Sequence, residues 1–314
     1  MENDSPSHAA AHATGPAVAR QAGLSLDSDA PGVLRDILSL TKPRLSTLVL
    51  FTAGGAMALA PVPVSAARAL LGIGGTMLVV AGANALNCYL ERETDRGMAR
   101  TASRPLPQRR MKPALALGVG LALSFVSIAV LSLTVPPLAG LLAAVALLLY
   151  VLVYTPMKRT SSLSVLVGAV PGALPPVIGW VAATGSIDPP AFVLFGILFL
   201  WQVPHSLAIG IFRADEYTRA GLVVHPVEHG IESTRLQMLI YSLGLFPTPL
   251  LLVWMGVAGL PTAVAGSAMG AVLVYSAFDG WRNQGEARWA SRYFRLTLLY
   301  MTVLMTAMVL DHWL

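Results

Sequence analysis

Nine long runs of apolar residues limit what this 314-residue chain can fold into. A helix needs about 20 apolar residues to cross a bilayer core about 30 Å thick. Runs of about this length predict membrane-spanning helices near residues 45–61, 69–90, 114–134, 137–156, 163–183, 191–211, 237–257, 262–280 and 293–311. Only 12% of the residues are charged, against about 25% in soluble domains. We therefore predict an all-α, polytopic membrane protein and exclude a soluble one.

Basic residues fall on one side of this predicted topology. Of the 21 Lys and Arg residues, all but Arg68 lie in the N-terminal segment or in alternate connections between the spans. Loops rich in Lys and Arg stay in the cytoplasm, so we predict a cytoplasmic N-terminus and a C-terminus on the opposite side. The net charge of +5 then reflects membrane orientation and does not indicate nucleic-acid binding. An Arg-rich, Lys-poor composition is typical of GC-rich bacterial genomes, so the predicted location is the bacterial inner (plasma) membrane.

The N-terminal segment differs in composition from the rest of the chain. Residues 1–35 are polar, carry several acids and contain no apolar run with a cleavage signature, so they do not read as a signal peptide. We predict a disordered cytoplasmic tail over 1–35 and a single transmembrane domain over 36–314. The single cysteine, Cys88, excludes a disulfide framework.

A stripe of oxygen-bearing side chains is predicted at the cytoplasmic end of the second span. Asn87, Glu91 and Asp95 are spaced four residues apart, which places them on one helix face. Two carboxylates on one face repel each other unless a cation lies between them, and a set of oxygen ligands suits Mg²⁺. The following loop carries Arg100 and Arg104, whose guanidinium groups suit phosphate oxygens. The pattern predicts a metal-held diphosphate; the alternative is that the Arg residues follow the positive-inside rule and pair with the acids.

A second acidic group stands at the cytoplasmic end of the sixth span, where Arg213, Asp215, Glu216, Tyr217 and Arg219 follow one another. Taken alone it is a solvated helix end, but beside the first cluster it predicts a second wall for metal or diphosphate. A short basic turn with Lys158 and Arg159 lies on the same predicted side.

Two further features lie inside apolar runs. The fifth span contains three prolines and three glycines between residues 168 and 180, which predicts a broken or kinked helix and a cavity wall; the alternative is a kinked packing helix. His205 lies near the middle of the sixth span. It either bonds to a neighbour, ligates a metal or haem iron, or moves a proton.

These motifs, in this order and spacing, resemble those of the intramembrane (UbiA-type) prenyltransferases, and within them the protohaem IX farnesyltransferase (haem O synthase) subfamily. The resemblance covers roughly residues 36–312. It rests on residues 40–44, 87–107, 154–159, 168–180, 201–205, 215–217 and 220–221. Glu91 and Glu216 stand where many members have Asp, and Ser206-Leu207 replaces a frequent aromatic pair.

The resemblance implies nine helices around a central cavity that cytoplasmic loops cap. The implied reaction transfers the farnesyl group of farnesyl diphosphate to a vinyl group of protohaem (haem b), with addition of water, giving haem O and diphosphate. It implies Mg²⁺ on Asn87, Glu91, Asp95 and Asp215, with Glu216 as a further catalytic acid. The implied substrate-binding residues are Lys42, Arg44, Arg100, Arg104, Tyr154, Lys158, Arg159, His205, Arg213 and Tyr217. Implied partners are the lipid bilayer and haem A synthase or the terminal-oxidase assembly.

Two alternatives stay open at this point. One is a prenyltransferase for another acceptor, such as a hydroxybenzoate, a quinone precursor or a chlorophyllide. The other is a non-catalytic membrane carrier for an anionic lipid or haem. The paired acid stripes argue against the carrier, because carboxylates at its mouth would repel an anion.

Overall fold

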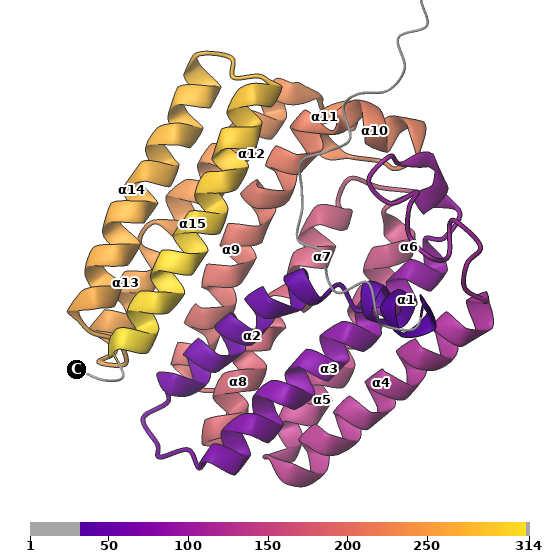
Figure 1. Ribbon diagram of the computed structural model, residues 1–314. Coiled ribbons are helices and arrows are strands. Elements are labelled where there is room, and N and C mark those ends of the chain that lie inside the picture. Colours follow the sequence, from indigo (N-terminus) through magenta and orange to yellow (C-terminus); the bar gives the residue numbers. More distant parts are fainter. Residues whose placement is uncertain (1–31, 312–314) are drawn as a thin grey trace, which may run out of the picture.

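The computed structural model describes residues 32–311, except for the side chains of residues 44 and 45, and all regular secondary structure in this range is helical (Figure 1). Eight helical segments are long and apolar enough to cross a membrane. They are α3 (Ala66–Leu90), α4 (Pro113–Thr134), α5 to α6 (Pro137–Met157), α7 with α8 (Ser164–Thr184), α9 (Pro189–Phe212), α12 with α13 (Gly230–Trp254), α14 (Leu260–Arg282) and α15 (Ala287–Asp311). The shorter apolar helix α2 (Pro43–Ala58) accounts for the first predicted span. The predicted all-α membrane architecture is confirmed.

The helical chain starts earlier than predicted. Helix α1 (Gly32–Leu40) begins within the segment that we assigned to the tail, while the rest of that tail, residues 1–31, lies outside the described residues. The buried Asp36 carboxylate lies 3.0 Å from the Arg110 guanidinium. This ion pair fixes α1 to the loop that follows α3.

Glycines set the closest helix contacts. A Cβ at Gly82 of α3 would lie 2.4 Å from the Ser124 hydroxyl oxygen of α4, and one at Gly179 of α8 would lie 2.1 Å from the Ala53 carbonyl oxygen of α2. Helices in lipid associate through close packing and small residues, because lipid is as apolar as the side chains. The glycines therefore determine which helices can touch.

Two helices are interrupted where they face the interior. One residue, Ala173, separates helix α7 (Ser164–Gly172) from helix α8 (Leu174–Thr184), so the predicted break in the fifth span is confirmed. The helix α5 (Pro137–Leu148) continues as a π-helical segment, η2 (Leu149–Tyr154), and then as α6 (Thr155–Met157). Such π turns are common at functional sites.

Short helices and loops close one end of the bundle. The cap consists of η1 (Thr94–Gly97) with the loop up to residue 112, α10 (Ala214–Arg219) and α11 (His225–Glu228). In Figure 1, α10 and α11 lie over the upper ends of α9 and α12 (Gly230–Leu245), next to the loop after α3; α13 (Thr248–Trp254) lies lower. This cap holds the charged residues that the sequence singles out.

Candidate active site

A cavity of about 310 Å³ lies beneath this cap, between α3, η2, α7 and α9. Nine of the predicted site residues line it: Lys42, Asn87, Glu91, Asp95, Arg100, Arg104, Tyr154, Lys158 and Tyr217. Residues from the break in the fifth span, Gly168, Ala169 and Gly172, line it as well, which confirms that this span forms a cavity wall. The tertiary structure thus brings both halves of the chain to one site.

The acid stripe is built differently from the prediction. Helix α3 ends at Leu90, Glu91 is its C-terminal cap, and Asp95 lies in the 3₁₀ turn η1. The single continuous helix face was therefore wrong. The turn is held by the Asp95 amide, which donates to the Glu91 carbonyl at 2.7 Å, and all three oxygen-bearing side chains still reach the same cavity.

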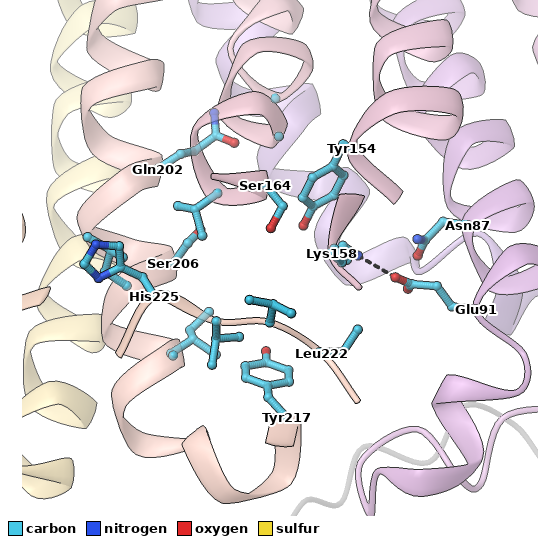
Figure 2. Close-up of a pocket in the computed structure, with 18 of the residues that line it drawn as sticks. Asn87, Glu91, Tyr154, Lys158, Ser164, Gln202, Ser206, Tyr217, Leu222 and His225 are labelled. Atoms are coloured by element: carbon cyan, nitrogen blue, oxygen red, sulfur yellow. Dashed lines mark hydrogen bonds and ion pairs between the residues drawn. The ribbon is translucent and has the colours of Figure 1, made fainter. Parts of the chain in front are cut away.

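Two lysines bond to the first two side chains of the stripe. Lys42 donates from Nζ to the Asn87 amide oxygen at 3.0 Å, and Lys158 donates to a Glu91 carboxylate oxygen at 2.8 Å (Figure 2). Burial lowers the pKa of Lys42. Burial also opposes charge on Lys158, but neighbouring Tyr154 and the Glu91 carboxylate outweigh it and raise the pKa of Lys158. Lys158 is therefore a permanent cation in the cavity.

Asp95 has the strongest features of a cation ligand. Its side chain is 1% exposed, and its Oδ2 accepts a hydrogen bond from Arg104 Nη1 at 2.7 Å. The other oxygen, Oδ1, is buried and has no hydrogen-bond partner among the described residues. Buried polar atoms are nearly always satisfied, so this orphaned oxygen beside a cavity fits a bound cation.

The second acidic group only partly reaches the cavity. Tyr217 lines it, but Asp215 is exposed and Arg213 and Glu216 do not line it. Glu216 instead accepts hydrogen bonds from Arg213 Nη1 at 2.6 Å and from the Arg100 amide at 3.2 Å. Burial acts to raise the pKa of Glu216, but these contacts outweigh it and hold the pKa below its usual value. The group therefore ties α10 to the arginine loop.

No three His, Cys, Asp or Glu side chains come together in a metal-binding cluster within residues 32–311. Asp215, which the resemblance implied as a metal ligand, is exposed and does not line the cavity. Arg159 also lies outside the cavity lining, where it donates to the Thr94 hydroxyl at 2.6 Å. The Arg44 side chain lies outside the described part of the structure.

The model of the UbiA prenyltransferase family matches residues 48–299, which is most of the chain. This protein belongs to the UbiA prenyltransferase family. It is 48% identical over 278 residues to a protein of Anaeromyxobacter dehalogenans named protoheme IX farnesyltransferase, covering 88% of this chain and 94% of that one. A protein of the same name from Myxococcus xanthus is 47% identical over 282 residues, covering 90% and 96% of the two chains.

Solved structures share the fold of this UbiA-family chain. A digeranylgeranylglyceryl phosphate synthase gives a TM-score of 0.76 at 16% identity, over 89% of this chain and 98% of that one. The apo structure of a UbiA homolog from Aeropyrum pernix gives 0.72 at 20% identity, over 85% and 98%. A homolog from Archaeoglobus fulgidus, solved with DMAPP and Mg²⁺, gives 0.61 at 15% identity, over 87% and 99%.

His205 of this UbiA-family chain does not line the cavity. Its ring stacks on Trp201 at 4.7 Å and packs against Phe294 at 4.6 Å. Its Nδ1 lies 2.7 Å from the Thr297 hydroxyl oxygen, whose own hydrogen is donated to the Phe294 carbonyl. Nδ1 must therefore carry the hydrogen of a neutral ring, which leaves the lone pair on Nε2.

The sequence reasoning missed part of the cavity. Uncharged polar side chains line the wall away from the acids: Ser164 on α7, Gln202 and Ser206 on α9, and His225 on α11 (Figure 2). The one available signal was the amide of Gln202 within an apolar run, since polar groups in membrane spans are costly. The contribution of Ser164 depends on tertiary packing and had no signal in the sequence.

Proposed function

We propose that this chain transfers the farnesyl group of farnesyl diphosphate to a vinyl group of protohaem IX, with addition of water, giving haem O and diphosphate. The observation that carries the proposal is the identity of 47–48% over at least 88% of the chain to relatives named protoheme IX farnesyltransferase. The cavity supports it, because one end carries acids and cations and much of the rest is apolar.

The residues at the acidic end fit Mg²⁺. Asn87, Glu91 and Asp95 supply amide and carboxylate oxygens, the ligands that Mg²⁺ takes together with phosphate oxygens and water. The unpartnered Oδ1 of Asp95 is the strongest ligand candidate in this set. When bound, the metal neutralises the charge that develops on the leaving diphosphate. Asp215, which the resemblance also implies as a ligand, is exposed and does not line the cavity.

The chain's own cations bind the remaining charge. Arg100, Arg104, Lys42 and Lys158 all line the cavity near the acids. They would donate to diphosphate oxygens as the carbon–oxygen bond breaks, which stabilises the developing negative charge. Apolar side chains such as Val165 and Leu207 line the other part of the cavity, so bulk water is kept from the allylic cation.

Identifying the molecule that accepts the farnesyl group distinguishes this function from prenylation of another acceptor. The test uses the purified full-length protein in lipid nanodiscs with farnesyl diphosphate and, in separate reactions, protohaem IX or a hydroxybenzoate. Mass spectrometry of the extracted pigment should show protohaem gaining one farnesyl group and one water. Prenylated hydroxybenzoate beside unmodified haem would replace the proposal with the other-acceptor function, and no product from either would refute both.

Removing divalent cations should abolish the reaction. Each of the paired acids keeps its lysine or arginine partner without metal, so the protein should stay folded while it loses the charge that neutralises diphosphate. We expect product formation to stop after dialysis against EDTA and to return with Mg²⁺. Full activity in EDTA, with metal content verified by elemental analysis, would contradict the metal proposal.

We also propose that His205 provides an axial ligand to the haem iron. Its Nδ1 bonds to the Thr297 hydroxyl and no described residue bonds to Nε2. Because the ring packs against Trp201 and Phe294 and does not line the cavity, haem binding would require these side chains to move. Replacing His205 by Leu should remove this ligand, weaken protohaem binding and shift the Soret band in a titration without farnesyl diphosphate. The control is His229→Leu, since the His229 side chain is 48% exposed at the cap; an unchanged His205→Leu spectrum would refute the ligand role.

The proposed function also includes a membrane orientation and protein partners. We propose an inner-membrane protein with the active-site mouth in the cytoplasm, and haem A synthase or the terminal-oxidase assembly as the acceptor of its product. The support for the orientation is the distribution of Lys and Arg over the connections.

A further inference from the structure

The wall of the cavity away from the acids carries three uncharged polar side chains. Gln202 and Ser206 lie four residues apart on α9, on one helix face, and Ser164 projects from α7 (Figure 2). In Figure 2 Gln202 and Ser206 lie on the opposite side of the cavity from Asn87 and Glu91, and Ser164 lies between the two sides, next to Tyr154. Gln202 and Ser206 are therefore separated from the place where diphosphate would bind.

The amide of Gln202 is held in one orientation. Its Nε2 donates to the Leu198 carbonyl at 3.3 Å, and its Oε1 has no hydrogen-bond partner among the described residues. A Cβ at Gly172 would lie 2.0 Å from this oxygen. The glycine at the break between α7 and α8 therefore leaves the space that the amide oxygen occupies.

The two serine hydroxyls are also unused. Within residues 32–311, the hydroxyl groups of Ser164 and Ser206 have no hydrogen-bond partner, although both side chains line the cavity. Serines inside membrane helices can bond to the carbonyl one turn earlier, as Ser124 does with Gly120 at 2.7 Å, but Ser206 does not. Ser164 is the first residue of α7, so its helix has no earlier turn. Three groups with free hydrogen-bonding capacity therefore face one apolar space.

We propose that Gln202, Ser206 and Ser164 hold the water molecule that becomes the hydroxyl group of the product. This inference rests on the proposed function. A water needs two to four polar partners to be retained in a cavity, which this wall supplies. All three groups are uncharged, so they can bind water without competing with the lysines and arginines for the diphosphate.

The position of the water fits the order of bond changes. The bond between farnesyl C1 and oxygen breaks, and its electron pair leaves with diphosphate. The vinyl π electrons then form the new carbon–carbon bond to C1, which leaves a positive charge on the vinyl carbon next to the porphyrin ring. The held water adds its oxygen to this carbon, and the released proton goes to diphosphate.

Separation across the cavity also protects the first cation. Water beside the diphosphate would attack farnesyl C1 and produce farnesol. Water on the α9 wall meets only the second cation, after the new bond has formed. If no water is held there, that second cation instead loses a proton from the neighbouring carbon, and the product is an alkene lighter by one water.

The test measures the ratio of alkenyl to hydroxylated farnesyl haem by mass spectrometry. Gln202→Met and Ser206→Ala, in the full-length protein with protohaem and farnesyl diphosphate, should raise this ratio by about tenfold each, the factor that one hydrogen bond can contribute. Ser206→Thr keeps a hydroxyl, so it should stay near the wild-type ratio.

Gln108→Met is the matched control, because Gln108 is exposed and does not line the cavity. An unchanged ratio in Gln202→Met and Ser206→Ala would overturn the inference, whether or not total turnover falls, because a general loss of fit lowers both products together. Wild-type protein that forms no farnesylated haem would refute the proposed function itself, so the two failures are distinguishable.

Discussion

Asp95→Asn should reduce prenyl transfer by about 100- to 1,000-fold, the range seen when one group that stabilises developing charge is removed. The carboxylate is buried, holds Arg104 through Oδ2 and leaves Oδ1 free for a cation. Asn is isosteric but neutral, so it removes half of the carboxylate charge that the stripe offers to a metal. The measurement is the initial rate of product formation over a series of Mg²⁺ concentrations.

Glu93→Gln is the matched control for this prediction. Glu93 lies two residues away, is 60% exposed and pairs with Arg96 at the surface, so its variant should keep wild-type rates. The Asp95→Asn protein should still insert in the membrane and elute as the wild type does in size-exclusion chromatography. Wild-type rates for Asp95→Asn at all Mg²⁺ concentrations would refute the metal site.

Gly179→Ala should cause the largest loss of stability among single glycine changes. A Cβ at this position would lie 2.1 Å from the Ala53 oxygen and 2.8 Å from its carbonyl carbon. These are backbone atoms of α2, so neither can rotate away, and α8 is buried on all sides. Overpacking costs about 1–3 kcal/mol and more where the backbone must move, so the midpoint of thermal inactivation in detergent should fall markedly.

Gly118→Ala on α4 provides the comparison, because no atom lies within 4 Å of its added Cβ. Alanine favours the helix over glycine by about 1 kcal/mol, so this variant should keep or slightly raise the midpoint. Equal midpoints for Gly179→Ala and Gly118→Ala would mean that α2 and α8 do not meet as closely as described.

The sequence alone was sufficient for features that depend on local patterns. Lengths of apolar runs predicted the helices, because a bilayer demands a fixed length. Prolines and glycines predicted the interruption that Ala173 makes between α7 and α8, since proline cannot continue the hydrogen bonding of a helix. Asn87, Glu91 and Asp95 were predicted as one site, and all three line the cavity.

Other features depend on which surfaces meet in space. The family resemblance implied Asp215 as a metal ligand, but in α10 the Tyr217 side chain lines the cavity while Asp215 is exposed. The direction of the His205 side chain could not be predicted from the sequence either. Gln202 and Ser206 lie on the same helix and face the cavity, while the His205 ring packs on α15.

What the sequence by itself determined is the membrane architecture and the acidic end of the site, because both follow from residue types at short spacings. Only the tertiary structure decided how the rest of the cavity is lined. Ser164 and Gln202 are 38 positions apart and come from different helices. Their side chains line the same cavity because Gly172 lets α7 and α9 approach each other. A contact between segments that are distant in the chain produces no periodic pattern in the sequence.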